Sequence, residues 1–338
     1  MERFHRLNRL IGILFGCCFV LIFLFTVSVS LWVWPEKFQS LLVPSPTQEI
    51  RPLDTLWHAP DTLSIPKGPD GDQIRRGREL IKYTSRFFGP EGSIRQMSNG
   101  MNCQNCHLEA GTRAFGNNYG SVASQYPKYR ARSGSMESIE KRINDCFLRS
   151  LNGDSLPSRS EEMKAMVAYL KWVGKDVPPK KKAHGSGLVK LRWLERAASP
   201  ERGKEIFKTK CIRCHEKDGQ GKHGHYSYYE YPPLWGDHSF NTAAGLYRIS
   251  NLAGYVYANM PNGSTIDKPD LLEEEAWDVA AYIISMPRPV KHFAGNWPSL
   301  KDKPVDHPFG PYTDSFPELQ HQYGPFATIE KTHKSKTR

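Results

Sequence analysis

The chain has 338 residues, which is enough for two domains with separate hydrophobic cores. Its 46 lysine and arginine residues outnumber 35 acidic ones and give a net charge of +11. The basic residues are scattered and the N-terminus predicts export, so we expect no nucleic-acid partner. A small anionic substrate or an acidic redox partner fits this charge better.

A membrane anchor is the first element that the sequence predicts, in residues 1–35. Arg3, Arg6 and Arg9 precede an uncharged, mostly apolar run over residues 11–34. This run exceeds the roughly 20 residues that cross a bilayer and is longer than a signal-peptide core. The basic flank should stay in the cytoplasm, which places the rest of the chain on the periplasmic side of a bacterial inner membrane.

The sequence also permits two alternatives to an uncleaved anchor. Cleavage after a small residue such as Ser30 would release the chain into the periplasm. Lipidation at Cys17, where "LFGC" loosely resembles a lipoprotein signal, is less favoured because the apolar run continues well beyond this cysteine.

Two Cys-x-x-Cys-His motifs follow, "CQNCH" at 103–107 and "CIRCH" at 211–215. This pattern is typical of c-type haem attachment. Two thiols at this spacing reach the vinyl groups of one porphyrin, and the adjoining histidine lies beneath the iron as its proximal ligand. A zinc or redox site is the alternative, and the repetition disfavours it. The motifs predict two covalently bound haem c groups, at Cys103, Cys106, His107, Cys211, Cys214 and His215.

Similar segments frame both motifs. "RRGRELI" (75–81) and "ERGKEIF" (201–207) each predict an opening helix with glycine at the same place. "SEEMKAMVAYLKWV" (160–173) and "LEEEAWDVAAYIISM" (272–286) predict closing helices with acidic first turns. We therefore expect an all-α protein with two tandem class I cytochrome c domains after an N-terminal transmembrane helix.

The repeat also sets the expected domain boundaries. The stretch "DVPPKKKAHGSG", rich in proline, lysine and glycine, predicts a linker between the domains. We expect an N-terminal domain with haem 1 at 36–176, a linker at 177–198, a C-terminal domain with haem 2 at 199–290, and an irregular segment that wraps the surface at 291–338.

The sixth iron ligands are predicted from the loops before the closing helices. In the second domain "NMPNG" supplies Met260, and Met286 in "SMPRP" is the alternative. When the two closing helices are aligned on their Ala-Tyr pairs, Cys146 of "RINDCFLRSLNG" occupies the place of Met260. Met136 is out of register, and two further methionines are predicted as core residues of the closing helix, Met163 and Met166.

An unpaired Cys146 has two interpretations. A buried cysteine can simply be a small apolar residue. A free thiol is a liability in an oxidising compartment, however, and this one stands where iron needs a ligand. A thiolate ligand stabilises ferric iron and is a strong nucleophile toward sulfur, which suits redox chemistry on a sulfur oxyanion.

The chain resembles the dihaem thiosulfate dehydrogenases, which couple two thiosulfates into tetrathionate and can run in reverse. "MNCQNCHLEAGT", "FGNNYGSVASQYPKYRARSG" and "IEKRINDCFLRSLNG" are similar to their first domain, and "YPPLWGDHSFN", "YVYANMPNG" and "EAWDVAAYI" to their second. The resemblance covers residues 72–290. It implies an active site at haem 1 and an electron exit at haem 2.

The resemblance also implies roles for individual residues. Haem 1 would be ligated by His107 and Cys146, and haem 2 by His215 and Met260. The residues implied around the substrate are Arg132, Arg142, Asp145 and Ser150. For the two arginines, pairing with haem propionates or exposure to water is the alternative. Asn259 departs from the family, in which some members place at this position a lysine that exchanges with methionine as haem ligand.

The sequence is compatible with several functions. The expected partners are thiosulfate and tetrathionate, together with a cytochrome c or a membrane-bound electron acceptor. The main alternative is a non-enzymatic, membrane-anchored dihaem electron carrier, which the cysteine at position 146 disfavours. A sulfur-oxidising cytochrome that needs a carrier protein and a dihaem peroxidase are further alternatives.

Overall fold

A computed structural model describes residues 15, 18–22, 25–26, 56–224 and 228–336 of the chain. Two compact units are present, Met1–Asp54 and Thr55–Arg338. In the first unit the described residues are helical, and most of the predicted anchor at 1–35 lies outside them. Among the residues that are described, no helix has the length and apolar character that a bilayer crossing requires.

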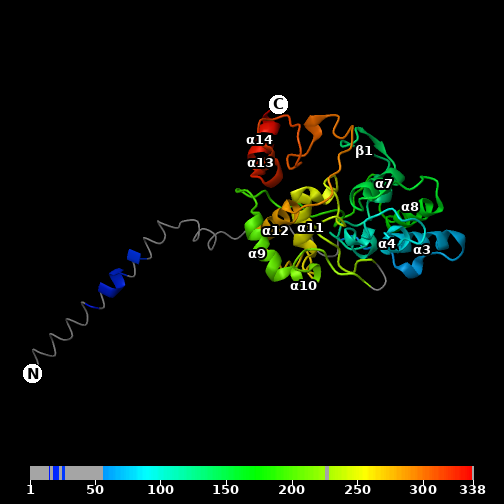
Figure 1. Ribbon diagram of the computed structural model, residues 1–338, viewed down its shortest axis with the longest axis horizontal. Helices are drawn as coiled ribbons and strands as arrows, with labels where there is room; N and C mark the ends of the chain where they lie inside the picture. The colour runs from blue at the N-terminus through cyan, green and yellow to red at the C-terminus, as the bar shows by residue number, and fades with distance from the viewer. Residues whose placement is uncertain (1–14, 16–17, 23–24, 27–55, 225–227, 337–338) are drawn as a thin grey trace, which may run out of the picture. The chain divides into compact units, whose positions relative to one another are not determined.

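The second unit is mainly helical, with one small antiparallel hairpin among its described residues (Figure 1). Its longer helices form pairs, and most short helices lie in the loops between them. In chain order the elements are η2 (Thr62–Ser64), α3 (Pro69–Lys82), α4 (Thr84–Phe88), η3 (Cys103–Asn105), α5 (Leu108–Gly111), α6 (Val122–Gln125), β1 (Lys128–Arg130), β2 (Ser135–Glu137), α7 (Ile139–Arg149), α8 (Glu161–Val173), α9 (Pro200–Lys210), α10 (Ile212–His215), η4 (Gly245–Tyr247), α11 (Ile249–Asn259), α12 (Glu273–Ser285), η5 (Leu300–Asp302), α13 (Glu318–Tyr323) and α14 (Phe326–Lys336).

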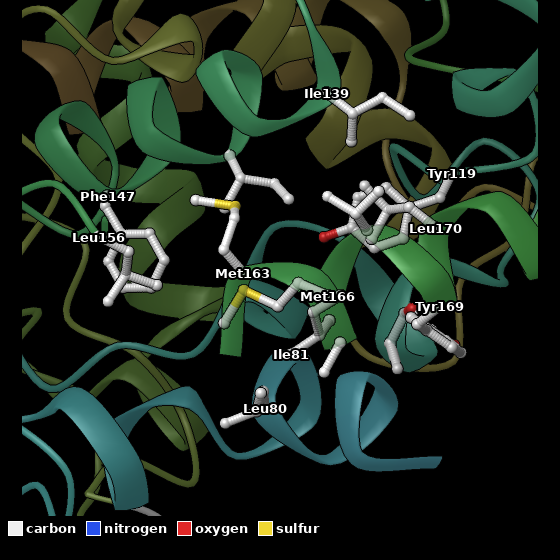
Figure 2. Close-up of a cluster of buried hydrophobic side chains, with 14 of the residues drawn as sticks. Leu80, Ile81, Tyr119, Ile139, Phe147, Leu156, Met163, Met166, Tyr169 and Leu170 are labelled. Carbon is white, nitrogen blue, oxygen red and sulfur yellow. Dashed lines mark hydrogen bonds between the residues drawn. The ribbon is translucent and has the colours of Figure 1, made fainter. Parts of the chain in front are cut away.

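The opening and closing helices of the first domain, α3 and α8, begin at sequence signals. Pro69 occupies the first turn of α3, where its missing N–H costs no hydrogen bond. The side chain of Ser160 caps α8 by accepting from the Met163 N–H. Leu80 of α3 and Met166 of α8 belong to one buried cluster (Figure 2), so the two helices form the core beneath the first motif.

The second domain repeats this arrangement with α9 and α12. Ser199 caps α9 through the Arg202 N–H, and Pro200 lies in its first turn. A second buried cluster gathers around Phe207 of α9 and Trp277 of α12. The predicted arrangement of two helical domains is therefore confirmed.

Glycine permits the helix crossing in both domains. A Cβ atom on Gly77 would stand 1.9 Å from the Ala165 carbonyl oxygen, and one on Gly203 would stand 1.9 Å from that of Asp278. Only a residue without a Cβ lets the two backbones approach this closely. Both crossings involve the glycine that the two predicted opening helices share.

The segment between the domains is packed on both of them. The Phe115 N–H of the first domain donates to the Gly185 carbonyl at 2.7 Å. On the other side, a Cβ atom on Gly254 of α11 would stand 2.0 Å from the Val189 carbonyl oxygen. The linker therefore fixes the domains against one another over much of its length.

The C-terminal segment (residues 291–338) contains two helices, α13 and α14, where the sequence predicted irregular structure. Phe326 and Ile329 of α14 are fully buried in the second core. Earlier in the segment, the Trp297 N–H donates to the Arg132 carbonyl at 2.7 Å. The segment thus completes the second domain and returns to the first, where it passes beside β1 (Figure 1).

Candidate active site

The first Cys-x-x-Cys-His motif presents its histidine in the form that binds iron. The Nδ1–H of His107 donates to the Asn117 carbonyl at 2.5 Å, which leaves Nε2 as the nitrogen for a metal. Tyr119 stacks on the imidazole with ring centroids 4.6 Å apart. Burial lowers the pKa of His107 to about 4, so the ring is neutral.

The second motif repeats this geometry. The Nδ1–H of His215 donates to the Pro232 carbonyl at 2.9 Å, again leaving Nε2 for iron. Burial lowers the pKa of His215 as well. In both domains a backbone carbonyl therefore sets the tautomer and the orientation of the predicted proximal ligand.

Cys146 lies on α7 and faces the first motif. Burial, followed by the negative charge of a Cys146 thiolate, raises the pKa of the Cys103 and Cys106 thiols to about 12. A charge has an appreciable effect only on near neighbours in a buried site. Cys146 therefore lies near the two cysteines of the first motif, and its ligation of haem 1 stays a prediction.

The methionines weighed as alternatives in the first domain occupy other surroundings. Met136 lies on β2 and is 62% exposed. Met163 and Met166 are fully buried and pack with Leu80 and Ile81 of α3 (Figure 2). Their role in the core follows from these contacts.

The predicted distal ligand of haem 2, Met260, directly follows α11. Its N–H donates to the Val256 carbonyl at 2.8 Å and so ends the helix. Its side chain packs against the second core, as does that of Met286 at the end of α12. Ligation by Met260 stays a prediction.

Arg142 lies one helical turn before Cys146 on α7, so the two side chains project from the same face. The negative charge of Cys146 is the largest of the influences that raise the pKa of Arg142. The charge of Arg142 in turn lowers the pKa of His107. Among the described residues Arg142 makes no ion pair, so its guanidinium is available to an anion beside the thiol.

Asp145 forms the centre of a buried ion-pair cluster. Its carboxylate lies 3.2 Å from Arg132 Nη2, 3.2 Å from Lys141 Nζ and 3.7 Å from Arg149 Nε. Burial raises the pKa of Asp145, but the surrounding cations outweigh burial and hold it below its ordinary value. The carboxylate therefore positions Arg132 and Arg149, and this gives Asp145 a positioning role.

Ser150 directly follows α7, four residues after Cys146. Its N–H donates to the Cys146 carbonyl at 2.8 Å, and its own carbonyl accepts from the Asn99 side chain at 3.3 Å. These main-chain contacts hold the last turn of the helix that carries the thiol.

Two cations near the predicted site were missed from the sequence, Lys141 and Arg149. Together with Asp145 they form an i, i+4, i+8 series on α7, and this spacing is the signal that could have found them. Arg149 is only 6% exposed. Its burial could not be inferred, because its covering residues come from the second domain and the C-terminal segment.

The residues of both motifs fit a c-type haem. Each motif has two cysteines beside a partly buried, neutral imidazole whose Nδ1 is already engaged, and this is the donor set that c-type haem requires. The two cysteines and the histidine of each motif would hold one haem, which would supply one-electron redox chemistry, and Cys146 stays the predicted second ligand in the first domain.

Family comparisons agree with this geometry. Residues 93–178 match the family model described as SoxA/TsdA, cytochrome c domain, and residues 200–287 match the model described as cytochrome c. The thiosulfate dehydrogenase of Psychrobacter arcticus is 36% identical over 249 residues, which cover 73% of this chain and 73% of that protein. The chain belongs to the dihaem thiosulfate dehydrogenase family. As a member of this family of oxidoreductases, it carries two covalently bound c-type haems.

Other family members show the same likeness. The thiosulfate dehydrogenase of Allochromatium vinosum is 36% identical over 235 residues, which cover 68% of this chain and 84% of that protein. A solved structure, the thiosulfate dehydrogenase TsdBA of Marichromatium purpuratum in its as-isolated form, aligns with a TM-score of 0.63 and 28% identity. That alignment covers 76% of this chain and 54% of the solved chain, so the present chain matches about half of its length.

Proposed function

We propose that this protein oxidises two thiosulfate dianions to one tetrathionate dianion and passes the two released electrons to an external acceptor. The observation that carries the proposal is Cys146, a sulfur nucleophile near the first motif, with Arg142 one turn away and in no ion pair among the described residues. A dihaem electron carrier needs neither feature.

The thiolate of Cys146 has two tasks in this reaction. It first bonds to the terminal sulfur of one thiosulfate, giving a cysteine S-thiosulfonate and two electrons. The terminal sulfur of a second thiosulfate then attacks the bound terminal sulfur. Tetrathionate leaves, and Cys146 is again a thiolate. Two bound haems would supply the capacity to accept these two electrons. Run backwards, the same steps reduce tetrathionate.

The cations supply what the substrate needs. Two dianions must approach one another, and neighbouring positive charges and donors reduce their repulsion. Arg142 can donate to the anion beside Cys146, and Arg132 is held nearby by its ion pair with Asp145. A bidentate guanidinium suits an oxyanion better than an ammonium group does.

The contact between the domains is the proposed route for electrons between the two haem-binding motifs. The Tyr255 hydroxyl of α11 reaches the main chain of the first motif, and Asn259 Nδ2 donates to the Phe115 carbonyl at 3.1 Å. These contacts hold the predicted Met260 loop close to the loop that carries haem 1. These contacts also engage the side chain of Asn259, which stands where some family members have the exchanging lysine. We therefore propose that Met260 remains the ligand of haem 2 throughout the reaction.

The uncharged run at residues 11–34 supports a position on the periplasmic side of the inner membrane, anchored by residues 1–35. A membrane-bound acceptor or a small cytochrome c is the proposed electron partner.

The test is thiosulfate-dependent reduction of ferricyanide by the purified dihaem protein and by Cys146→Gly. We expect the variant to lose turnover by at least about a thousandfold while haem 2 keeps its absorption spectrum, because the covalent step is removed. Cys18→Ser, outside the second unit, is the matched control and should keep full activity. Undiminished turnover in Cys146→Gly would falsify the mechanism, and no turnover in the unaltered protein would favour a simple electron carrier.

A further inference from the structure

A second basic site is lined by Arg132 and Arg149, the two arginines that pair with Asp145. It is a cavity of about 290 Å³ between the first domain, the segment before α11 and the C-terminal segment. None of the residues that line it is acidic. Its cations are Arg132, Arg149, Arg248, Lys291 and Lys303.

Two of these cations are engaged in holding the C-terminal segment. The Nε–H of Arg248 donates to the Asp306 carboxylate at 3.0 Å. The Lys303 ammonium donates to the carbonyls of Phe309, at 2.5 Å, and Pro311, at 3.0 Å. Their positive charges contribute to the field of the cavity, and these contacts tie both side chains to the C-terminal segment.

The remaining three cations have unused capacity. Arg132 and Arg149 share a single carboxylate, Asp145, which Lys141 also approaches. Lys291 Nζ makes one long contact, 3.4 Å to the Gly153 carbonyl. These three cations therefore carry more positive charge than Asp145 balances.

Arg149 provides an independent indication of a ligand. Its guanidinium stacks over the Phe293 ring at 4.2 Å, and Nη2 donates to Asn296 Oδ1 at 3.2 Å. Its Nε–H, at 3.7 Å from Asp145, has no hydrogen-bond partner among the described residues although the side chain is 7% exposed. A buried donor without an acceptor destabilises the folded protein, and a bound oxyanion would satisfy it.

We infer that this cavity is a second anion site, distinct from the position beside Cys146, and that it binds a doubly charged sulfur oxyanion. Neither Cys146 nor Arg142 lines it. Its natural occupant is a second thiosulfate, and this identification rests on the proposed function, whose reaction consumes two such dianions. Arg132 lines the cavity and pairs with Asp145, the residue that adjoins Cys146 in the chain, so this ion pair links the cavity to the helix that carries the thiol.

The test uses sodium sulfate, a dianion without redox activity, titrated calorimetrically into the dihaem protein. Replacing Lys291 by Gln should lower the sulfate affinity about tenfold, since a charge-assisted hydrogen bond is lost. Lys301→Gln, an exposed lysine that does not line the cavity, is the matched control and should bind sulfate normally. In the Arg142→Ala variant, the part of sulfate binding that depends on Lys291 should persist.

Two results would overturn the inference. One is sulfate binding that is absent, or equal in Lys291→Gln and the unaltered protein. The other is binding that Arg142→Ala alone removes, which would place the anion beside Cys146. In the Cys146→Gly background, thiosulfate should displace sulfate, and failure to do so would exclude thiosulfate as the occupant. Calorimetry reports these outcomes whether or not the protein turns over thiosulfate.

Discussion

The hydroxyl group of Tyr255 donates a hydrogen bond of 2.8 Å to the main-chain carbonyl of Asn105. Tyr255 lies on α11, the helix that ends at Met260, and Asn105 lies inside the first Cys-x-x-Cys-His motif. A single side chain thus joins the ligand loop of one predicted haem to the attachment loop of the other. This contact is one of those that hold the two predicted redox centres relative to one another.

Tyr255→Phe removes only the hydroxyl and should lower the free energy of unfolding by about 1 kcal/mol, because a buried carbonyl loses its donor. Denaturant titration followed by haem absorbance measures the change. Tyr257→Phe, on the same helix, is the control, because no hydrogen bond of its hydroxyl is found among the described residues. Equal effects of the two substitutions would contradict this role.

Arg132→Ala and Arg142→Ala should each raise the thiosulfate concentration at half-maximal rate about tenfold or more, since each removes a cation from the site of a dianion. Steady-state ferricyanide assays measure this quantity. Arg159→Ala, an exposed arginine, is the comparison variant. If neither active-site substitution changes half-saturation, the proposed substrate position is wrong.

Asp145→Asn should destabilise the protein by about 3 kcal/mol, because it leaves three cations around a neutral buried amide. It should also weaken thiosulfate binding by releasing Arg132 from its present position. Thermal unfolding and half-saturation are the two measurements. Asp154→Asn, at an exposed position, should change neither quantity.

Gly77→Ala and Gly203→Ala should each cost about 1–3 kcal/mol of unfolding free energy, because the added methyl group meets a backbone carbonyl of the facing helix. Denaturant titration gives the value. Gly245→Ala serves as control, since no atom lies within 4 Å of its added Cβ. If neither variant lowers the free energy of unfolding, the close contact of the paired helices does not contribute to stability.

The stability of the C-terminal segment should depend on His307. Burial, with repulsion from Lys303 and Arg248, lowers the pKa of His307 to about 4, although Asp306 and the Phe309 carbonyl oppose the shift. The folded protein therefore binds fewer protons than the unfolded chain between this value and about 6.5, and stability falls as the pH falls.

Lowering the pH from 7 to 5 should consequently cost about 2 kcal/mol through this group. His307→Gln should show a correspondingly flatter dependence of melting temperature on pH. His58→Gln, at an exposed position, should keep the slope of the unaltered protein. Parallel slopes in all three proteins would rule out His307 as the origin.

The repeated helices could be predicted because their signals are local. The closing helices expected at 160–173 and 272–286 match α8 (Glu161–Val173) and α12 (Glu273–Ser285) to within a residue at each end. Acidic first turns and apolar spacing determine both. The opening helix α3 extends further toward the N-terminus than expected, because its first turns are polar and lack the apolar pattern.

The surroundings of the thiol could be predicted only in part. Arg142 is visible from its spacing to Cys146 on one helix. The partners of Arg149 come from residues far away in the chain, such as Ala243, Phe293 and Asn296, and no local pattern connects them. Helix α14 was missed because few of its residues are apolar, and its helix depends on burial of Phe326 and Ile329.

The return of Trp297 to Arg132 has a consequence for biosynthesis. A ribosome makes the chain from its N-terminus, so the first domain emerges long before the residues that cover its arginine side. Trp297 and its neighbours can cover Arg132 only after the final part of the polypeptide has been synthesised. A prematurely terminated product would thus carry both cofactor-attachment sequences and still leave the Arg132 side of its first domain uncovered.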